Sequence, residues 1–228
     1  MRPGTFFGVS VGPGDPELIT MKAAKTIDAA DVIAFPGTLE APGIAYGIVE
    51  KRVARKPLLP CPVPMSHDRD VLSRARAAAA ERICAELARG HDVAYLCLGD
   101  VAVYSSYSYL AELVQERGYP TRAVAGVTSF CAAAAELGVP LCKGDEPLVI
   151  VPRIGAGLED VLDVPANKVF LKVGGYLEDL RHELLRRGQL ENASAIERCG
   201  LEGQRVIDLA EDGASAAYLT VALVREGR

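Results

Sequence analysis

Apolar residues along the chain form short continuous runs that end at glycine, and longer stretches with helical spacing follow them. The clearest run is Val93 to Leu98, which ends in Gly99-Asp100 and precedes a tyrosine-rich stretch. This order indicates a buried strand, a tight turn and a helix. Because ligands of open parallel sheets bind beyond the carboxyl ends of strands, the turn is a candidate binding position.

The first part of the chain repeats the order of strand, turn and helix. Strands are predicted at 5–11, 31–35, 93–98 and 121–125, and helices at 17–30, 44–51, 68–89, 103–117 and 130–137. Three prolines make 58–65 an extended segment. This order predicts a mostly parallel sheet with right-handed crossovers.

The second part of the chain has a different order of elements. Strands are predicted at 148–152, 168–173, 193–198, 204–209 and 218–224, and helices at 157–162 and 177–187. No helix separates the last three strands, which favours antiparallel pairing. Glycine, proline and charged residues gather at 138–147, a typical boundary. We therefore predict an α/β fold of two domains: residues 1–140 with a mostly parallel sheet, and residues 141–228 with a mixed sheet.

Composition narrows the function classes. Of the 228 residues, 50% are hydrophobic and 24% are charged, which is typical of a soluble globular protein. The net charge of −5 argues against non-specific nucleic-acid binding. We expect no membrane span, because no apolar run reaches about 18 residues, and no signal peptide, which makes the cytoplasm the expected location.

The spacing of the cysteines and histidines does not predict a metal site or a redox-active thiol pair. The six cysteines show no C-x-x-C pair, and the three histidines are far apart in the sequence. We therefore expect buried thiols and no metal site.

Glycine-containing turns follow three of the predicted parallel strands, at 12–14, 99–100 and 126–129. The first resembles neither a Rossmann fingerprint nor a P-loop, because position 17 is Glu and no Gly-Lys-Ser/Thr follows. Asp15 and Glu17 place negative charge at the helix start, where a phosphate would bind. Three such turns at one sheet edge predict a cleft. Asp100 itself has two open interpretations, a ligand-binding carboxylate or a helix cap.

The stretch 104–109 holds three tyrosines and three serines, and at helical spacing Tyr104 and Tyr107 share one side. Core aromatics and a substrate-facing flank are both open interpretations. No Gly-x-Ser-x-Gly elbow is present, so a serine hydrolase is disfavoured. The charged residues of the long helix are interpreted as a solvated face; they are Arg74, Arg76, Glu81, Arg82 and Glu86.

Taken in order, these motifs resemble the tetrapyrrole (class III) S-adenosylmethionine-dependent methyltransferases. The resemblance runs through residues 8–20, 29–36, 98–104, 126–130, 171–174 and 197–200. Within the family, the segments 99–110, 126–130 and 218–220 are most similar to the C20-methyltransferases of cobalamin biosynthesis. The chain departs at Val101, where most members have proline. Pro64-Met65-Ser66 is more similar to the anaerobic version.

The resemblance implies a cofactor cleft between the two domains and a set of S-adenosylmethionine-binding positions. Carried over by motif, they are Pro13, Leu98, Gly99, Asp100, Val103, Thr128, Ser129 and Lys172, with Tyr218, Leu219 and Thr220 added. Candidate bases are Tyr104, Tyr107 and Glu197, and Lys172, Arg153 and Arg198 are candidates for substrate carboxylates.

The implied reaction is C20-methylation of precorrin-2 or of cobalt-factor II (cobalt-precorrin-2). The meso carbon attacks the sulfonium methyl group, so the protein mainly positions two partners. The family also implies a homodimer. The alternatives are a related enzyme that methylates another corrinoid carbon, RNA or protein, and a non-catalytic tetrapyrrole carrier.

Overall fold

The computed structural model describes residues 2–64, 66, 68–153, 157–211 and 216–226, so Met65 of the Pro64-Met65-Ser66 motif lies outside the described residues. The chain divides into two compact units, Met1–Thr128 and Ser129–Arg228. Each unit contains one five-stranded sheet. The division lies before the predicted 140/141 boundary because helix α5 (Ser129–Glu136) contacts strand β10 (Thr220–Val224) of the second unit.

The first unit is built on a parallel sheet. Its strands are β1 (Phe6–Ser10), β2 (Val32–Phe35), β3 (Leu58–Pro60), β4 (Val93–Cys97) and β5 (Thr121–Val124). Their order is β3-β2-β4-β1-β5, and every pairing is parallel, as predicted. The neighbouring strands β4 and β1 are apolar, apart from Ser10 at the end of β1, because helices cover both of their faces.

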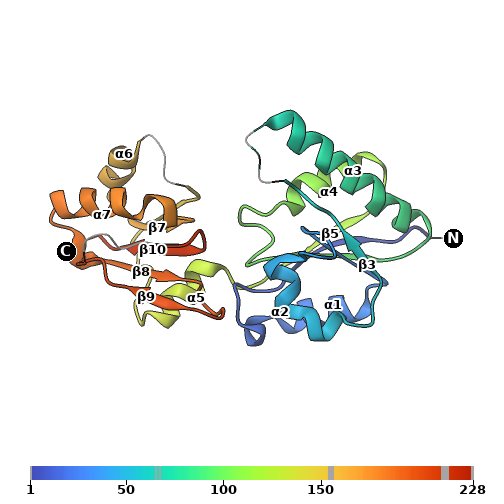
Figure 1. Cartoon of the computed structure of the whole chain (residues 1–228), viewed down its shortest axis with the longest axis horizontal. Coiled ribbons are helices and arrows are strands. Elements are labelled where there is room, and N and C mark those ends of the chain that lie inside the picture. The colour runs from blue at the N-terminus through green and yellow to red at the C-terminus, as the bar shows by residue number, and fades with distance from the viewer. Residues whose placement is uncertain (1, 65, 67, 154–156, 212–215, 227–228) are drawn as a thin grey trace. The chain divides into compact units, whose positions relative to one another are not determined.

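Helices lie on both faces of this sheet (Figure 1). They are α1 (Met21–Ala29), α2 (Gly43–Val53), α3 (Arg69–Ala88) and α4 (Tyr107–Glu116). One hydrophobic core joins α3 and α4 to the sheet, and a second joins α1 and α2 to the opposite face. The polar turns therefore remain at the strand ends.

Two predicted helices of the first unit begin later than expected. The predicted helix 17–30 is a 3₁₀ turn, η1 (Pro16–Leu18), followed by α1. The Thr20 side chain accepts a hydrogen bond from the Ala23 N–H, so Thr20 caps a new helix. The helix predicted from 103 begins at Tyr107. Tyr104 has φ 51°, a left-handed conformation that cannot continue a helix, so Tyr104 and Tyr107 do not share a helix face.

The second unit holds the mixed sheet. Its strands are β6 (Leu148–Val151), β7 (Asn167–Leu171), β8 (Ala193–Glu197), β9 (Arg205–Ile207) and β10, in the order β6-β7-β10-β8-β9. Only β6 and β7 pair in parallel, and the antiparallel pairing predicted for the last three strands is confirmed. The remaining elements are α6 (Leu158–Asp163), η2 (Gly174–Tyr176), α7 (Leu177–Arg186) and η3 (Leu190–Asn192).

Four of the six cysteines are buried, but Cys131 and Cys142 are exposed. The expectation of buried thiols is therefore wrong at these two positions. For Cys131, the reason is that the apolar pattern of α5 extends to a residue on its outer side. Among the described residues, no helix is long and apolar enough to cross a membrane.

Candidate functional site

Hydrogen bonds join the three glycine-containing turns at the carboxyl edge of the parallel sheet. The Gly99 N–H donates to the Gly12 carbonyl oxygen at 2.7 Å. The Gly126 N–H donates to Asp100 Oδ2 at 2.6 Å. The structure therefore brings together, within one unit, the three turns that the sequence placed at one edge.

Asp100 uses both carboxylate oxygens in this junction. Its Oδ1 accepts a hydrogen bond from the Ala102 N–H at 2.8 Å, while Oδ2 holds Gly126. The first contact stabilises the local turn, and the second connects the turn after β4 to the turn after β5. Asp100 is thus more than a helix cap, because it connects the turns that follow β4 and β5, the two strands on either side of β1.

Ser10 makes a second connection that sequence reasoning missed. Its side chain is fully buried at the end of β1. The hydroxyl donates to the Val124 carbonyl oxygen at 2.7 Å and accepts from the Val101 N–H at 2.8 Å. The available signal was a lone hydroxyl residue in an apolar strand, since such a residue must find partners when it is buried.

Gly126 is required by the close packing of these turns. A Cβ atom at this position would lie 2.3 Å from the Ser10 Cβ and 2.9 Å from the Gly99 carbonyl oxygen. Neither neighbour is the far end of a flexible chain. The three turns therefore form one rigid group, as a binding edge requires.

In the second unit, the later motif residues gather at the start of β10. The Val173 N–H donates to the Thr220 carbonyl oxygen at 3.2 Å, and the Arg198 N–H donates to that of Leu219 at 2.8 Å. The Lys172 ammonium lies 5.7 Å from the centre of the Tyr218 ring. Four of the motif-derived positions, from two segments distant in the sequence, thus lie next to each other.

Gly174 allows a second close approach of two backbones. A Cβ atom there would lie 2.0 Å from the Ala217 carbonyl oxygen. From the other side, Glu197 Oε2 accepts from the Ala217 N–H at 2.9 Å and from Arg205 Nη2 at 3.0 Å. These hydrogen bonds, that to Ala217 above all, lower the pKa of Glu197. Glu197 is buried and holds the loop before β10, an environment that argues against a proton acceptor.

Strained backbone marks the same turns. The non-glycine residues with positive φ in the described part of the chain are Tyr104 at 51°, Lys172 at 55° and Arg198 at 54°. Each such residue costs about 1–3 kcal/mol and is found mainly at functional sites. All three were singled out from the sequence for other reasons.

The two candidate tyrosines occupy different environments. Tyr107 is 6% exposed and packs against Phe6, with ring centres 5.2 Å apart, and burial raises its pKa. Tyr104 is 54% exposed, in the turn before α4. Tyr107 is therefore a core aromatic, whereas Tyr104 is accessible.

The other predicted positions are distributed along the same segments. Pro13 is buried within the first turn, Val103 is half-buried, and Leu98 is exposed at the end of β4. Thr128 ends the first unit and Ser129 begins α5. The candidate Arg153 donates a hydrogen bond from Nη2 to the Tyr176 hydroxyl at 2.9 Å.

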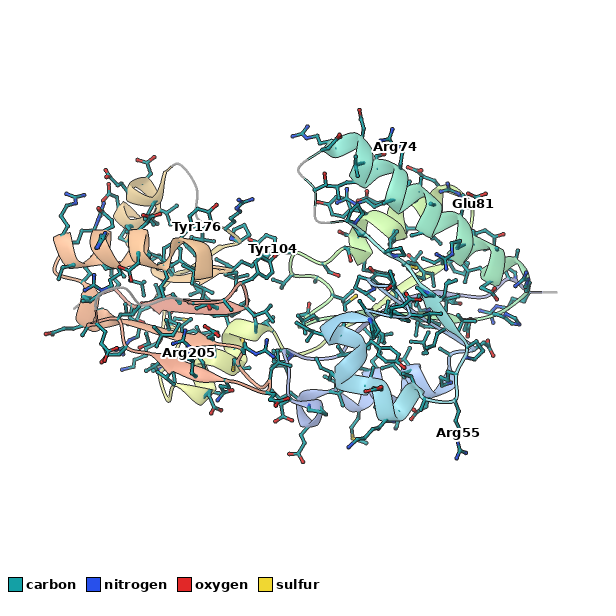
Figure 2. All side chains as sticks on the ribbon, in the orientation of Figure 1. Arg55, Arg74, Glu81, Tyr104, Tyr176 and Arg205 are labelled. Carbon is teal, nitrogen blue, oxygen red and sulfur yellow. The ribbon has the colours of Figure 1, made fainter. Side chains whose placement is uncertain are left out.

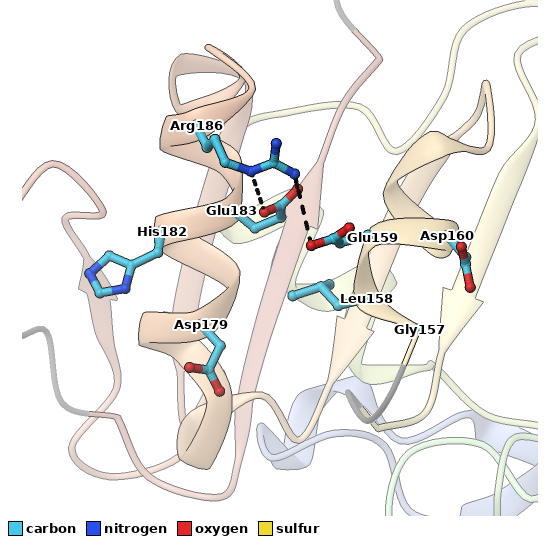
Figure 3. A pocket seen from close by; sticks show the side chains of 8 residues that line it. All are labelled: Gly157, Leu158, Glu159, Asp160, Asp179, His182, Glu183 and Arg186. Atoms are coloured by element: carbon cyan, nitrogen blue, oxygen red, sulfur yellow. Dashed lines mark hydrogen bonds and ion pairs between the residues drawn. The ribbon is translucent and has the colours of Figure 1, made fainter.

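A groove of about 600 Å³ between α6 and α7 lies away from the motif residues (Figure 3). It is lined by Gly157, Leu158, Glu159, Asp160, Asp179, His182, Glu183 and Arg186. Most of the charged side chains are acidic, so the groove repels a polycarboxylate. No group of three or more metal-ligating side chains occurs among the described residues.

Comparisons with known proteins give this arrangement a context. The family model described as Tetrapyrrole (Corrin/Porphyrin) Methylases matches residues 5–212. The chain belongs to this family. It is 32% identical to the precorrin-2 C(20)-methyltransferase of a Sinorhizobium species over 235 residues, which cover 97% of this chain and 95% of that protein.

Two further relatives extend this picture. The chain is 36% identical to the cobalamin biosynthesis protein CobIJ of Mycobacterium tuberculosis, with 99% of this chain and 46% of that protein covered. It thus spans about half the length of the mycobacterial relatives it matches. The crystal structure of the uroporphyrin-III C-methyltransferase of Thermus thermophilus matches with a TM-score of 0.67 and 25% identity, covering 99% and 93% of the two chains. These matches confirm the resemblance seen in the motifs.

Proposed function

We propose that this tetrapyrrole methylase uses S-adenosylmethionine to methylate C20 of precorrin-2 or of cobalt-factor II (cobalt-precorrin-2) in cobalamin biosynthesis. The observation that carries the proposal is the match, along nearly the whole of both chains, with a precorrin-2 C(20)-methyltransferase. The three hydrogen-bonded turns and the residues with positive φ fall within the segments through which the chain resembles this family, which supports the proposal.

The residues at the sheet edge fit S-adenosylmethionine. The Asp15 carboxylate accepts the Glu17 N–H at 2.8 Å, so two acidic residues lie at the start of η1, in the first turn, and would repel a phosphate there. A ligand without phosphate avoids this repulsion. Its amino, hydroxyl and adenine groups suit the close backbone of Gly99, Gly126 and Gly174. We propose that these turns and Lys172 bind it.

When bound, S-adenosylmethionine supplies an electrophilic methyl group on a cationic sulfur. The chain then has two tasks, to hold the macrocycle with C20 facing that methyl group and to accept the C20 proton. Rigid turns serve the first task. For the second, we propose Tyr104, because it is accessible, while Tyr107 lies in the core and Glu197 is engaged by Ala217. Tyr104→Phe should slow methyl transfer while S-adenosylhomocysteine still binds.

The direct test supplies the purified protein with S-adenosylmethionine and either precorrin-2 or cobalt-factor II without oxygen. Mass spectrometry should show one added methyl group, and a ¹³C-labelled methyl donor should place it at C20 by NMR. Comparing the two substrates decides between the metal-free and cobalt-containing reactions. No mass gain with either substrate, or a label at another carbon, would refute the proposal. Labelled transfer to RNA or protein would favour the alternative acceptors.

We also propose that the enzyme is a cytoplasmic homodimer, on the family resemblance. Light scattering after size-exclusion chromatography should give twice the chain mass of 24.2 kDa. A monomeric mass would contradict the dimer. Fractionation of cells should recover the enzyme with the cytoplasmic proteins, and recovery with membranes or secreted proteins would contradict that location.

A further inference from the structure

Arg76 occupies a position on α3 that the sequence pattern assigned to solvent. The inner side of this helix carries Ala79, Ala80, Ile83 and Leu87, all buried, and Arg76 continues the same stripe toward the N-terminus. Its side chain is half-buried. The interpretation of Arg76 as part of a solvated face is therefore wrong, because the stripe that packs against α4 includes it.

Arg76 stacks on an aromatic ring of the neighbouring helix. Its guanidinium carbon lies 3.7 Å from the centre of the Tyr109 ring, a short cation–π distance. Tyr109 is 48% exposed and lies in the first turn of α4, just after the turn that contains Gly99 and Asp100. Helices of a parallel α/β unit run against the strands, so these N-terminal parts of α3 and α4 lie at the carboxyl edge of the sheet.

The guanidinium of Arg76 keeps all its hydrogen-bond donors unused within the described residues. Its Nε is buried and has no hydrogen-bond partner there. No carboxylate of the described residues pairs with Arg76, whereas Arg52 and Arg89 each pair with one and Arg187 pairs with two. A buried donor without a partner is costly, and its persistence requires an explanation. The ring fixes the planar group, so that its donors can meet a carboxylate in a bidentate pair.

The charges around this pair favour an anion. The first half of α3 carries three arginines, at 69, 74 and 76, and Figure 2 shows Arg74 toward this end of the helix, with Glu81 further along. The acids on this half of the helix and at its cap are Asp70 and Asp68. Asp68 is engaged as the N-cap, accepting from two backbone N–H groups. This cationic region stands out in a chain with a net charge of −5.

We propose that Arg76, held on the Tyr109 ring, binds a side-chain carboxylate of the tetrapyrrole and so fixes which edge of the macrocycle enters the site. The inference rests on the proposed function, since it assumes a polycarboxylate macrocycle as substrate. Arg76 acts in recognition and orientation and takes no part in proton transfer. Tyr109 acts through Arg76 as a positioning residue.

The test uses a stable probe, uroporphyrin, an octacarboxylate porphyrin whose absorption band reports binding. Arg76→Gln should weaken uroporphyrin binding about tenfold, which corresponds to about 1.4 kcal/mol. Arg82→Gln is the matched control, because Arg82 is exposed on the same helix about 9 Å further along, and it should change binding less than about twofold. Arg76→Lys should recover only part of the affinity, since an ammonium group cannot form the bidentate pair.

Two further variants probe the stacking. Tyr109→Leu should weaken binding about threefold, and Tyr109→Phe should leave it nearly unchanged, because the ring and not the hydroxyl holds Arg76. S-adenosylhomocysteine affinity, measured by calorimetry, should be the same in all five variants, and the loss of the stacking should lower the melting temperature by no more than about 4 °C.

Equal losses in Arg76→Gln and Arg82→Gln would overturn the inference, because they would report overall charge. Absence of uroporphyrin binding by the unchanged protein would overturn it as well. The proposed function fails separately, when the unchanged protein transfers no methyl group to precorrin-2 or cobalt-factor II. If uroporphyrin binding still depends on Arg76 in that case, the carboxylate contact stands and only the reaction is refuted.

Discussion

Replacing Asp100 tests whether the three hydrogen-bonded turns at the edge of the parallel sheet bind the cofactor. Asp100→Ala removes the acceptors of two backbone N–H groups, those of Gly126 at 2.6 Å and Ala102 at 2.8 Å. Hydrogen bonds to charged groups contribute about 1.5–3 kcal/mol each, and partial exposure favours the lower value. The variant should thus lose about 3 kcal/mol of stability. For a chain of this size that lowers the melting temperature by roughly 6–12 °C.

The same loss sets a limit for ligand binding. If the turns at Gly99 and Gly126 must both be in place, about 3 kcal/mol corresponds to a loss of up to about 150-fold in S-adenosylhomocysteine affinity. Asp100→Asn keeps one acceptor oxygen and should fall between the alanine variant and the unchanged protein. Asp15→Ala is the control, because Asp15 accepts a single N–H in the first turn and should cost about 1 kcal/mol.

Titration calorimetry measures the S-adenosylhomocysteine affinity of each variant, and scanning calorimetry measures its melting temperature. A folded Asp100→Ala variant that binds S-adenosylhomocysteine within about twofold of the unchanged protein would refute the reasoning, since the connection to Gly126 would then have no role in binding. A loss equal to that of Asp15→Ala would also refute it, because any weakened cap would then give the same result.

Three further predictions concern the second unit. Gly174→Ala should lower both thermal stability and S-adenosylhomocysteine affinity, because the Ala217 carbonyl oxygen, 2.0 Å from the new Cβ, must move. Gly175→Ala, which places its Cβ in open space, should change neither quantity, and equal effects of the two variants would contradict this prediction. Lys172→Gly should be more stable to denaturant than Lys172→Ala by about 1 kcal/mol, because glycine adopts φ 55° without strain, and equal stability would exclude that strain. A thiol reagent should modify only the exposed Cys131 and Cys142 rapidly in the native protein, and fast reaction of more than two thiols would contradict the burial of the others.

Much of the fold follows from local patterns. The mainly apolar runs identified the central strands because helices cover both faces of a parallel sheet, and Ser10, at the end of β1, is the polar exception. The absence of predicted helices between the last strands identified antiparallel pairing, because parallel neighbours need a long crossover connection. These features depend on neighbouring residues in the sequence, so the sequence alone was sufficient.

The position of the domain boundary and the start of α4 needed information from distant residues. The cluster of glycine and proline at 138–147 marks a turn, yet α5 before it belongs with β10, more than 80 residues later. Helical spacing at 103–106 suggested a helix, but Tyr104 has a left-handed backbone. A tyrosine in the sequence does not predict a left-handed backbone, because only the surrounding structure can impose that conformation.

The candidate site shows the same division between local and distant information. Motif spacing identified the three turns that hydrogen bonds join in the structure, because each turn is a local feature. The contacts between the turns involve residues such as Ser10 and Gly126, which are 116 positions apart in the sequence. A Cβ atom added to Gly126 would lie only 2.3 Å from the Ser10 Cβ. Arg76 was misassigned for a related reason. Its charge alone predicted exposure to solvent, but it lies on the buried stripe of α3 and stacks on the ring of Tyr109. Residues whose role is fixed by a distant partner, such as Ser10 and Arg76, are thus the ones that sequence patterns miss or misassign.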